Sequence, residues 1–96
     1  MITHIVLFKL KEEKRQDALV LAEDLAKSLE RLPSVRSVRV GVDIRNATHS
    51  SDIGLLVDIE SDSAYQEYLS DPDHHAGARA LLDASDSIST VAITAR

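Results

Sequence analysis

Apolar residues occupy both sides of the first predicted strand, ITHIVLFKL (residues 2–10). Side chains alternate between the two faces of a β-sheet, so His4 and Phe8 face one side while Ile5 and Leu7 face the other. A strand that is apolar on both faces is typical of the centre of a sheet, where each face must be covered. The opening segment therefore predicts a central strand.

The apolar spacing changes to three and four residues between positions 12 and 32, which predicts an amphipathic helix with charged residues on its opposite side. Pro33 follows immediately, and proline is common just after a helix ends. The stripe consists of Ala18, Leu21, Ala22, Leu25, Leu29 and Leu32.

Alternation returns in three later segments, which we predict to be strands: residues 35–44, 52–60 and 87–94. The polar segment 46–52 is rich in turn-forming residues and predicts a loop between the first two of them.

A helix interrupted in its middle is predicted between the last two strands. Ser61 or Ser63 is a suitable N-cap, and Ser63 has Gln66 three residues later, which is the capping-box spacing. A second helical segment, 72–84, begins with a proline preceded by Asp71, and this pair is typical of a helix start.

This order, βαββαβ, predicts a ferredoxin-like α+β fold with a four-stranded antiparallel sheet and helices on one face. The other face would still carry apolar side chains, including Ile5, Leu7 and Leu56. An apolar face of that kind is typical of an interface, so we predict a homodimer formed through the sheet. We expect ion pairs at its rim from Arg39, Asp43, Asp52 and Asp58.

Length and composition indicate a one-domain protein and argue against several classes of partner and site. Ninety-six residues are enough for one domain, which we assign to positions 1–96. A net charge of −5 argues against nucleic acid as a partner, because its phosphates require clustered cations. The absence of cysteine excludes disulfides and a thiolate nucleophile. We find no apolar run of membrane-spanning length and no signal-peptide pattern, so we expect a cytoplasmic protein with no membrane partner.

YLSDPDHH (residues 68–75) contains the candidate catalytic side chains. A histidine with a pKa near neutrality suits a base, so His74 is the candidate for that role. The hydroxyl of Tyr68 suits a donor to a developing oxyanion. We expect the start of the second helical segment to keep His74 unprotonated. The alternative is that this stretch is only a junction between helices, with Tyr68 in the core.

His4 has two interpretations as well, a hydrogen-bonded structural residue or a group that positions a ligand. We predict no metal site, because the adjacent His74 and His75 diverge by about 100° on a helix and cannot easily chelate together. No glycine-rich phosphate loop is present, and we predict no cofactor.

Two motifs resemble those of the stress-responsive dimeric α/β-barrel (Dabb) family, and the likeness covers nearly the whole chain. The first is a histidine before an apolar strand that ends in phenylalanine-lysine, here His4 and Phe8-Lys9. The second is a tyrosine followed by a histidine-proline-x-histidine group, here Tyr68 and residues 72–74. The resemblance implies a dimer whose two sheets form a barrel, with a small apolar cavity between sheet and helices in each subunit.

A plant polyketide cyclase of this family closes an aromatic ring by aldol condensation with a tyrosine and a histidine. The resemblance implies these roles for Tyr68 and His74, with His4 at the position of the cyclase's N-terminal histidine. This chain departs from the family pattern in having Asp71 for the first histidine of the group and Ile53 for a third-strand histidine. An aromatic residue near the end of the last strand is also absent.

The leading interpretation is therefore a small dimeric Dabb protein that binds a small apolar or carbonyl-containing molecule, with cyclase-like acid–base chemistry on a carbonyl compound such as a polyketide. A non-catalytic, stress-associated binding or oligomerisation module is the alternative. A cofactor-free monooxygenase is a third interpretation, which the absence of tryptophan disfavours.

Overall fold

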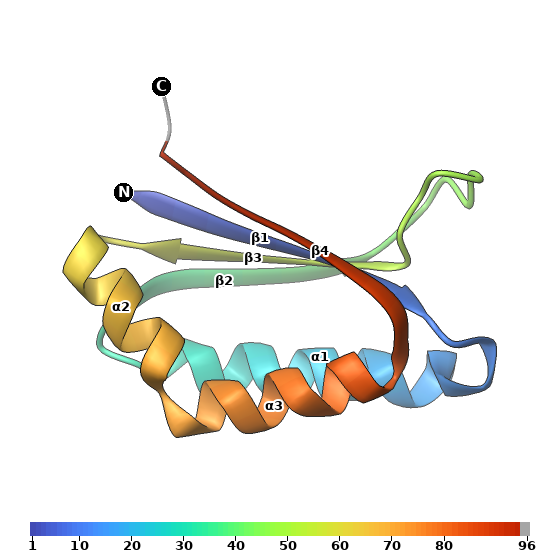
Figure 1. Cartoon of the computed structure of the whole chain (residues 1–96), viewed down its shortest axis with the longest axis horizontal. Coiled ribbons are helices and arrows are strands. Elements are labelled where there is room, and N and C mark those ends of the chain that lie inside the picture. Colours follow the sequence, from blue (N-terminus) through green and yellow to red (C-terminus); the bar gives the residue numbers. More distant parts are fainter. Residues whose placement is uncertain (95–96) are drawn as a thin grey trace.

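The four strands form one antiparallel sheet in the order β2-β3-β1-β4, and the helices lie on one of its faces (Figure 1). The computed structural model describes residues 1–94. Its elements are β1 (Ile2–Leu10), a 3-10 turn η1 (Glu12–Lys14), α1 (Arg15–Glu30), β2 (Val35–Val42), β3 (Ile53–Ile59), α2 (Asp62–Ser70), α3 (Pro72–Asp83) and β4 (Ser85–Thr94). This arrangement confirms the predicted ferredoxin-like fold, with β1 at the centre of the sheet.

The ends of several elements differ from the sequence prediction. β2 stops at Val42 because the chain turns into a hairpin, where the carboxylate of Asp43 accepts a hydrogen bond from the Asn46 amide and Asn46 has φ 51°. The N-cap of α2 is Ser61, whose hydroxyl accepts from the amide of Ala64. The capping box expected at Ser63 does not form the cap.

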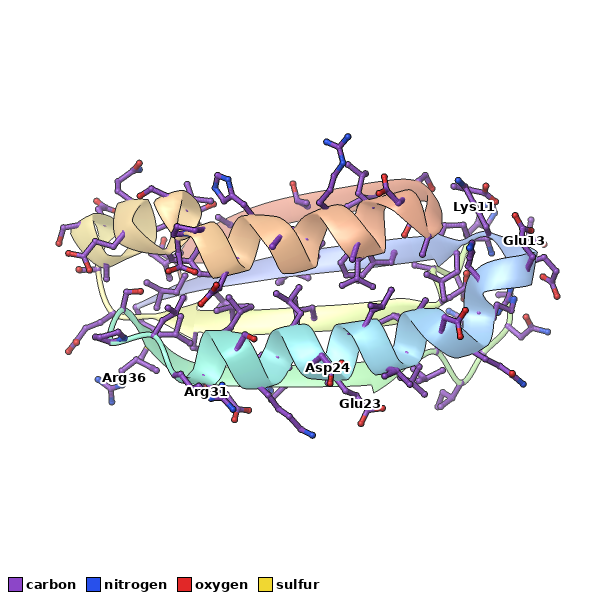
Figure 2. All side chains as sticks on the ribbon, turned by 90° about the horizontal axis from the view of Figure 1, so that it is seen from below. Lys11, Glu13, Glu23, Asp24, Arg31 and Arg36 are labelled. Atoms are coloured by element: carbon purple, nitrogen blue, oxygen red, sulfur yellow. The ribbon has the colours of Figure 1, made fainter. Side chains whose placement is uncertain are left out.

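One apolar core lies between the sheet and the helices. The predicted stripe of α1 packs there, with Ala18, Ala22, Leu25 and Leu29 in the core and Leu21 and Leu32 partly buried against it. Viewed from the helix side, α1 runs alongside α2 and α3, and the labelled charged side chains lie toward the ends of the molecule or on the solvent side of α1 (Figure 2). The largest fully buried side chains are Leu29, Leu55, Val57, Ile59, Tyr68 and Leu81.

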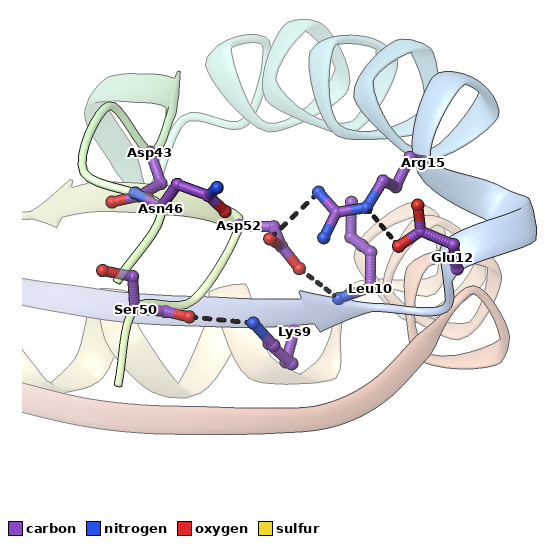
Figure 3. A network of polar contacts seen from close by, with 8 residues as sticks. All are labelled: Lys9, Leu10, Glu12, Arg15, Asp43, Asn46, Ser50 and Asp52. Atoms are coloured by element: carbon purple, nitrogen blue, oxygen red, sulfur yellow. Dashed lines mark hydrogen bonds and ion pairs between the residues drawn. The ribbon is translucent and has the colours of Figure 1, made fainter. Parts of the chain in front are cut away.

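Asp52 is buried, which corrects the prediction that it lies at the rim of the outer face. One of its carboxylate oxygens accepts from the Leu10 amide at 2.7 Å, and the other pairs with Arg15 at 3.1 Å (Figure 3). Arg15 also contacts Glu12 at 3.0 Å. Asp52 therefore joins the end of β1 to the start of α1 at the point where the β2–β3 hairpin returns to the sheet.

The outer face of the sheet is partly apolar, as predicted. Leu7, Val91 and Ile93 remain 39%, 50% and 45% exposed, and Ile5 pairs with Val91 in the β1–β4 register. Asp58 lies on the same face and accepts hydrogen bonds from the hydroxyls of two neighbours, Thr3 at 2.6 Å and Ser37 at 2.7 Å. The apolar outer face, defined as Ile5, Leu7, Leu56, Val91 and Ile93, has no element of this chain over it among residues 1–94.

Charged groups flank the apolar outer face. Arg39 on β2 lies 3.9 Å from Asp58, as expected for the rim. The hydrogen bond from Thr3, followed by that from Ser37, lowers the pKa of the Asp58 carboxyl. Asp58 therefore stays ionised at neutral pH, so this edge of the face carries a fixed pair of opposite charges.

Candidate functional site

A pocket of about 630 Å³ lies between α3 and the inner face of the sheet. The strand alternation places His4 on this inner face, together with Val6 and Phe8, while Ile5 and Leu7 face outward. Most of the lining is apolar. The larger apolar side chains are Val6, Phe8, Leu25, Leu55, Leu82 and Ile88.

The three predicted site residues come together at one end of this pocket. The Nδ1 atom of His4 and the hydroxyl of Tyr68 share a hydrogen bond of 2.8 Å between residues 64 positions apart in the sequence. The ring of His74 lies against the ring of Tyr68, with centroids 4.4 Å apart. All three residues line the pocket, so one strand and two helices contribute to the same site.

The break between α2 and α3 explains how Tyr68 and His74 meet. Asp71 is extended (φ −68°, ψ 128°), which ends α2 and turns the chain before Pro72 begins α3. The carboxylate of Asp71 then caps α3 by accepting from the amide of His74 at 2.9 Å. The cap fixes the first turn of α3, and it thereby places the imidazole of His74 over Tyr68.

Burial controls the protonation state of His74. Desolvation lowers the pKa of His74, the neighbouring His4 and His75 lower it further, and the nearby Asp71 opposes them. Burial is thus the first cause, rather than the helix N-terminus expected from the sequence. The Nδ1 atom of His74 is buried and has no hydrogen-bond partner among residues 1–94. An unpaired buried nitrogen is destabilising by about 1–3 kcal/mol, and such atoms are few in folded proteins.

The other two members of the site also have shifted proton equilibria. Desolvation lowers the pKa of His4 and therefore favours its neutral ring. Burial, with a smaller contribution from Tyr65, raises the pKa of Tyr68, so its hydroxyl keeps its proton throughout the physiological range. The site therefore combines a neutral imidazole, a protonated phenol and a second neutral imidazole in an apolar pocket.

Several residues of the site were not predicted. Tyr65 packs edge-on against His4 with ring centroids 5.7 Å apart, and its position one turn before Tyr68 is the signal that could have indicated it. His75 lines the pocket, and its Nε2 donates to the carbonyl of Leu69. Thr90 also lines the pocket, and only its strand periodicity pointed to this face. Arg79, the one positive charge of α3, lines the pocket as well.

The folded protein should lose stability as the pH falls below the ordinary histidine value of about 6.5. His4 and His74 have lowered pKa values when folded, so just below that pH the unfolded chain binds protons that the native state does not. The stabilisation that comes from keeping His4 and His74 neutral is complete above their unfolded-state pKa, and it decreases as the pH falls toward their folded-state pKa values. Urea unfolding at about pH 7.5 and about pH 5.5 measures it.

The variant His74→Gln isolates part of this effect. It removes one of the two shifted groups, so its stability should fall less between the same two pH values than that of the wild type. An equal decrease in both proteins would show that His74 does not contribute to the pH dependence.

Residues 1–94 contain no group of three or more His, Cys, Asp or Glu side chains arranged to hold a metal ion. In the same part of the chain, no helix is long and apolar enough to cross a membrane.

Comparisons with known proteins agree with this architecture. The sequence profile of the Stress responsive A/B Barrel Domain family matches residues 2–94. A dimeric ferredoxin-like protein of unknown function from Thermobifida fusca has a TM-score of 0.85 and 20% identity, covering 98% of this chain and 90% of that chain. A dimeric ferredoxin-like protein of unknown function from Bacteroides fragilis has a TM-score of 0.73 and 26% identity, with coverages of 96% and 93%.

Hydroxynitrile lyase from Passiflora edulis is similar in fold as well, with a TM-score of 0.84, 15% identity and coverages of 99% and 93%. No curated protein sequence matches the chain.

Proposed function

Because the chain belongs to the stress-responsive A/B barrel (Dabb) domain family, we propose that residues 1–96 form a single domain that acts as a homodimer and binds an apolar carbonyl compound between α3 and the sheet. His74 is the base, Tyr68 is the hydrogen-bond donor and His4 positions Tyr68. The observation that supports this assignment is the buried, unpaired Nδ1 of His74 beside the hydroxyl pair of Tyr68 and His4.

The first proposed step removes a proton from the carbon next to the carbonyl group. Neutral His74 accepts this proton, and the electron pair of the broken C–H bond moves onto the carbonyl oxygen as an enolate. The carboxylate of Asp71 favours the resulting imidazolium, as its effect on the pKa of His74 indicates. An aldol cyclisation follows when the enolate carbon bonds to a second carbonyl carbon, and the oxygen of that carbonyl takes the proton from the His74 imidazolium, which returns His74 to its neutral form.

Tyr68 stabilises the enolate oxygen by hydrogen bonding, because its raised pKa keeps the phenol protonated. When the proton of His4 is on Nδ1, His4 donates to the phenol oxygen and leaves the phenolic hydrogen free for the ligand. The reaction requires a base and a donor but no change of oxidation state, so we propose no cofactor.

The exchange of α-protons tests the function without knowledge of the natural substrate. In deuterated buffer, the protein should catalyse deuterium incorporation next to the carbonyl of an eight-carbon methyl ketone, which proton NMR detects as loss of the methyl and methylene signals. Incorporation at the rate of buffer alone would contradict the proposal.

The homodimer is proposed from the apolar outer face. Its five residues expose apolar surface on the side of the sheet opposite the pocket, and packing two such faces by a twofold axis removes both from water. The related proteins from Thermobifida fusca and Bacteroides fragilis are dimeric.

Replacing Leu7 by aspartate should weaken the dimer by about 100-fold or more, because twofold symmetry would bury two unpaired carboxylates in one interface. Light scattering coupled to size-exclusion chromatography should then show the mass of a monomer. The matched control is Val20→Asp, which introduces the same charge at an exposed apolar position on α1, in the opposite layer. A dimer that persists in Leu7→Asp at low protein concentration would rule out this interface.

A non-catalytic binding module is the second candidate, and the burial of Tyr68 favours it. Tyr68 is 0% exposed and its hydroxyl is already paired with His4, as in a structural hydrogen bond. In that case Tyr68→Phe and His74→Ala would alter ligand affinity or stability, and wild-type protein would not accelerate deuterium exchange. The third interpretation, a cofactor-free monooxygenase, and the cytoplasmic location remain predictions from the sequence.

A further inference from the structure

Arg79 places a positive charge at the same pocket. It lies on α3 with His75, Ala78 and Leu82, and this i, i+3, i+4, i+7 stripe lines the pocket along one side. The side chain of Arg79 is 76% exposed, so its guanidinium reaches water while its stem follows the pocket wall.

Among residues 1–94, Arg79 is the only permanently charged residue that lines this pocket, and the chain as a whole carries a net charge of −5. No carboxylate is among the lining residues in the described part of the chain, and two of the three lining histidines, His4 and His74, have lowered pKa values. A single cation at the opening of an apolar pocket favours an anionic group on an apolar ligand.

The ion pair that Arg79 already makes is weak, and a ligand can replace its partner. Its Nε lies 3.6 Å from the carboxylate of Asp83, one turn later on α3, and the Asp83 side chain is 70% exposed. Exposed ion pairs at this spacing contribute little to stability, so a ligand anion can replace Asp83 as the partner of Arg79.

We propose that the ligand of this pocket is an apolar carbonyl compound that also carries a carboxylate, and that Arg79 binds the carboxylate. This inference rests on the proposed function, because it assigns the reacting carbonyl to the end of the pocket near His74. The planar guanidinium matches a carboxylate with two parallel hydrogen bonds. A phosphate dianion would require more than this one cation, so a carboxylate is the better match.

The positions of His74 and Arg79 separate the two ends of the ligand. They are five residues apart on α3, which corresponds to roughly 7.5 Å along the helix axis. On α3, Ala76 and Ala78 lie between them and line the pocket, so the wall along the connecting chain is apolar. The carbonyl and the carboxylate therefore belong at opposite ends of an elongated molecule.

A matched pair of probes tests this inference: an eight-carbon methyl-keto acid with its two functional groups at opposite ends, and the primary amide of the same acid. NMR titration gives the dissociation constant of each. The wild type should bind the acid about fivefold more tightly than the amide, because an exposed ion pair is worth up to about 1 kcal/mol. Salt at about 0.5 M should reduce this preference.

Three variants make the test specific to Arg79. Arg79→Gln should remove the preference for the acid, whereas Asp83→Asn should increase it by freeing the guanidinium. Arg31→Gln removes the same charge at an exposed site at the end of α1 and should retain the wild-type preference.

Each outcome separates this inference from the proposed function. Equal affinities for acid and amide in the wild type, or a preference that survives in Arg79→Gln, would overturn the role of Arg79 while leaving the acid–base proposal standing if deuterium exchange is catalysed. If neither probe binds and no exchange is catalysed, both proposals are wrong.

Discussion

Replacing His74 by alanine is expected to lower the rate of deuterium exchange into the methyl ketone by about 100-fold or more. A positioned base contributes about 10²–10⁴-fold to a proton transfer, and His74 is the base in the proposed reaction. The unpaired Nδ1 of His74 makes no hydrogen bond that the variant would lose, so the fold should be retained. Exchange rates measured by NMR, together with circular dichroism spectra, test both statements.

Added imidazole distinguishes a lost base from a distorted pocket. His74→Ala leaves a space of about the size of the missing ring, so free imidazole should restore part of the exchange rate. The variant His49→Ala, which changes an exposed loop histidine, should exchange at the wild-type rate. A wild-type rate in His74→Ala would remove His74 from the reaction.

Tyr68→Phe should lower the same exchange rate by about 10²-fold, because loss of one oxyanion donor has an effect of about 10²–10³-fold. It also leaves His4 without its partner, so some loss of stability should accompany it. The comparison of the two effects is informative, since a purely structural Tyr68 would change stability and leave the rate per folded molecule unchanged.

Replacing Asp52 by alanine is expected to destabilise the protein by about 1–3 kcal/mol. The Leu10 amide would then be buried without an acceptor, and an unsatisfied buried donor has an effect of that size. The change would also release Arg15 at the start of α1. The shift of the urea unfolding midpoint measures the difference.

Two variants test whether the unsatisfied Leu10 amide causes the loss of stability. Asp52→Asn keeps an oxygen for the Leu10 amide while removing the charge, so it should be less destabilising than Asp52→Ala. Asp43→Ala removes an exposed carboxylate that caps only the hairpin turn, and it should change the stability by less than about 1 kcal/mol. Equal effects of Asp52→Ala and Asp43→Ala would show that burial of the Leu10 amide does not matter.

Strand alternation and helix periodicity predicted most of the fold and placed His4 on the inner face. The Asp71-Pro72 pair predicted a break between two helical segments. This break separates α2 from α3 and brings Tyr68 and His74 together. These features depend on local sequence, because backbone periodicity decides which side chains share a face.

The position of Asp52 could not be predicted from strand alternation. Alternation extended from Ile53 assigns Asp52 to the outer face, but β3 begins at Ile53, so the rule does not apply one residue earlier. The side chain of Asp52 turns inward and accepts a hydrogen bond from the Leu10 amide, which is 42 residues away in the sequence. The pocket likewise depends on contacts between distant elements, as where Gly77 of α3 faces Leu25 of α1.

The alternation of β1 has a consequence for the proposed dimer. His4, Val6 and Phe8 line the pocket, whereas Ile5 and Leu7, which separate them in the sequence, belong to the apolar outer face. In the proposed dimer, only the single layer of the sheet therefore separates the ligand from the partner subunit. A ligand that shifts this backbone alters the subunit contact, and thermodynamic linkage makes the effect reciprocal. One coupling free energy then sets both the change in dimer affinity on ligand binding and the change in ligand affinity on dimerisation.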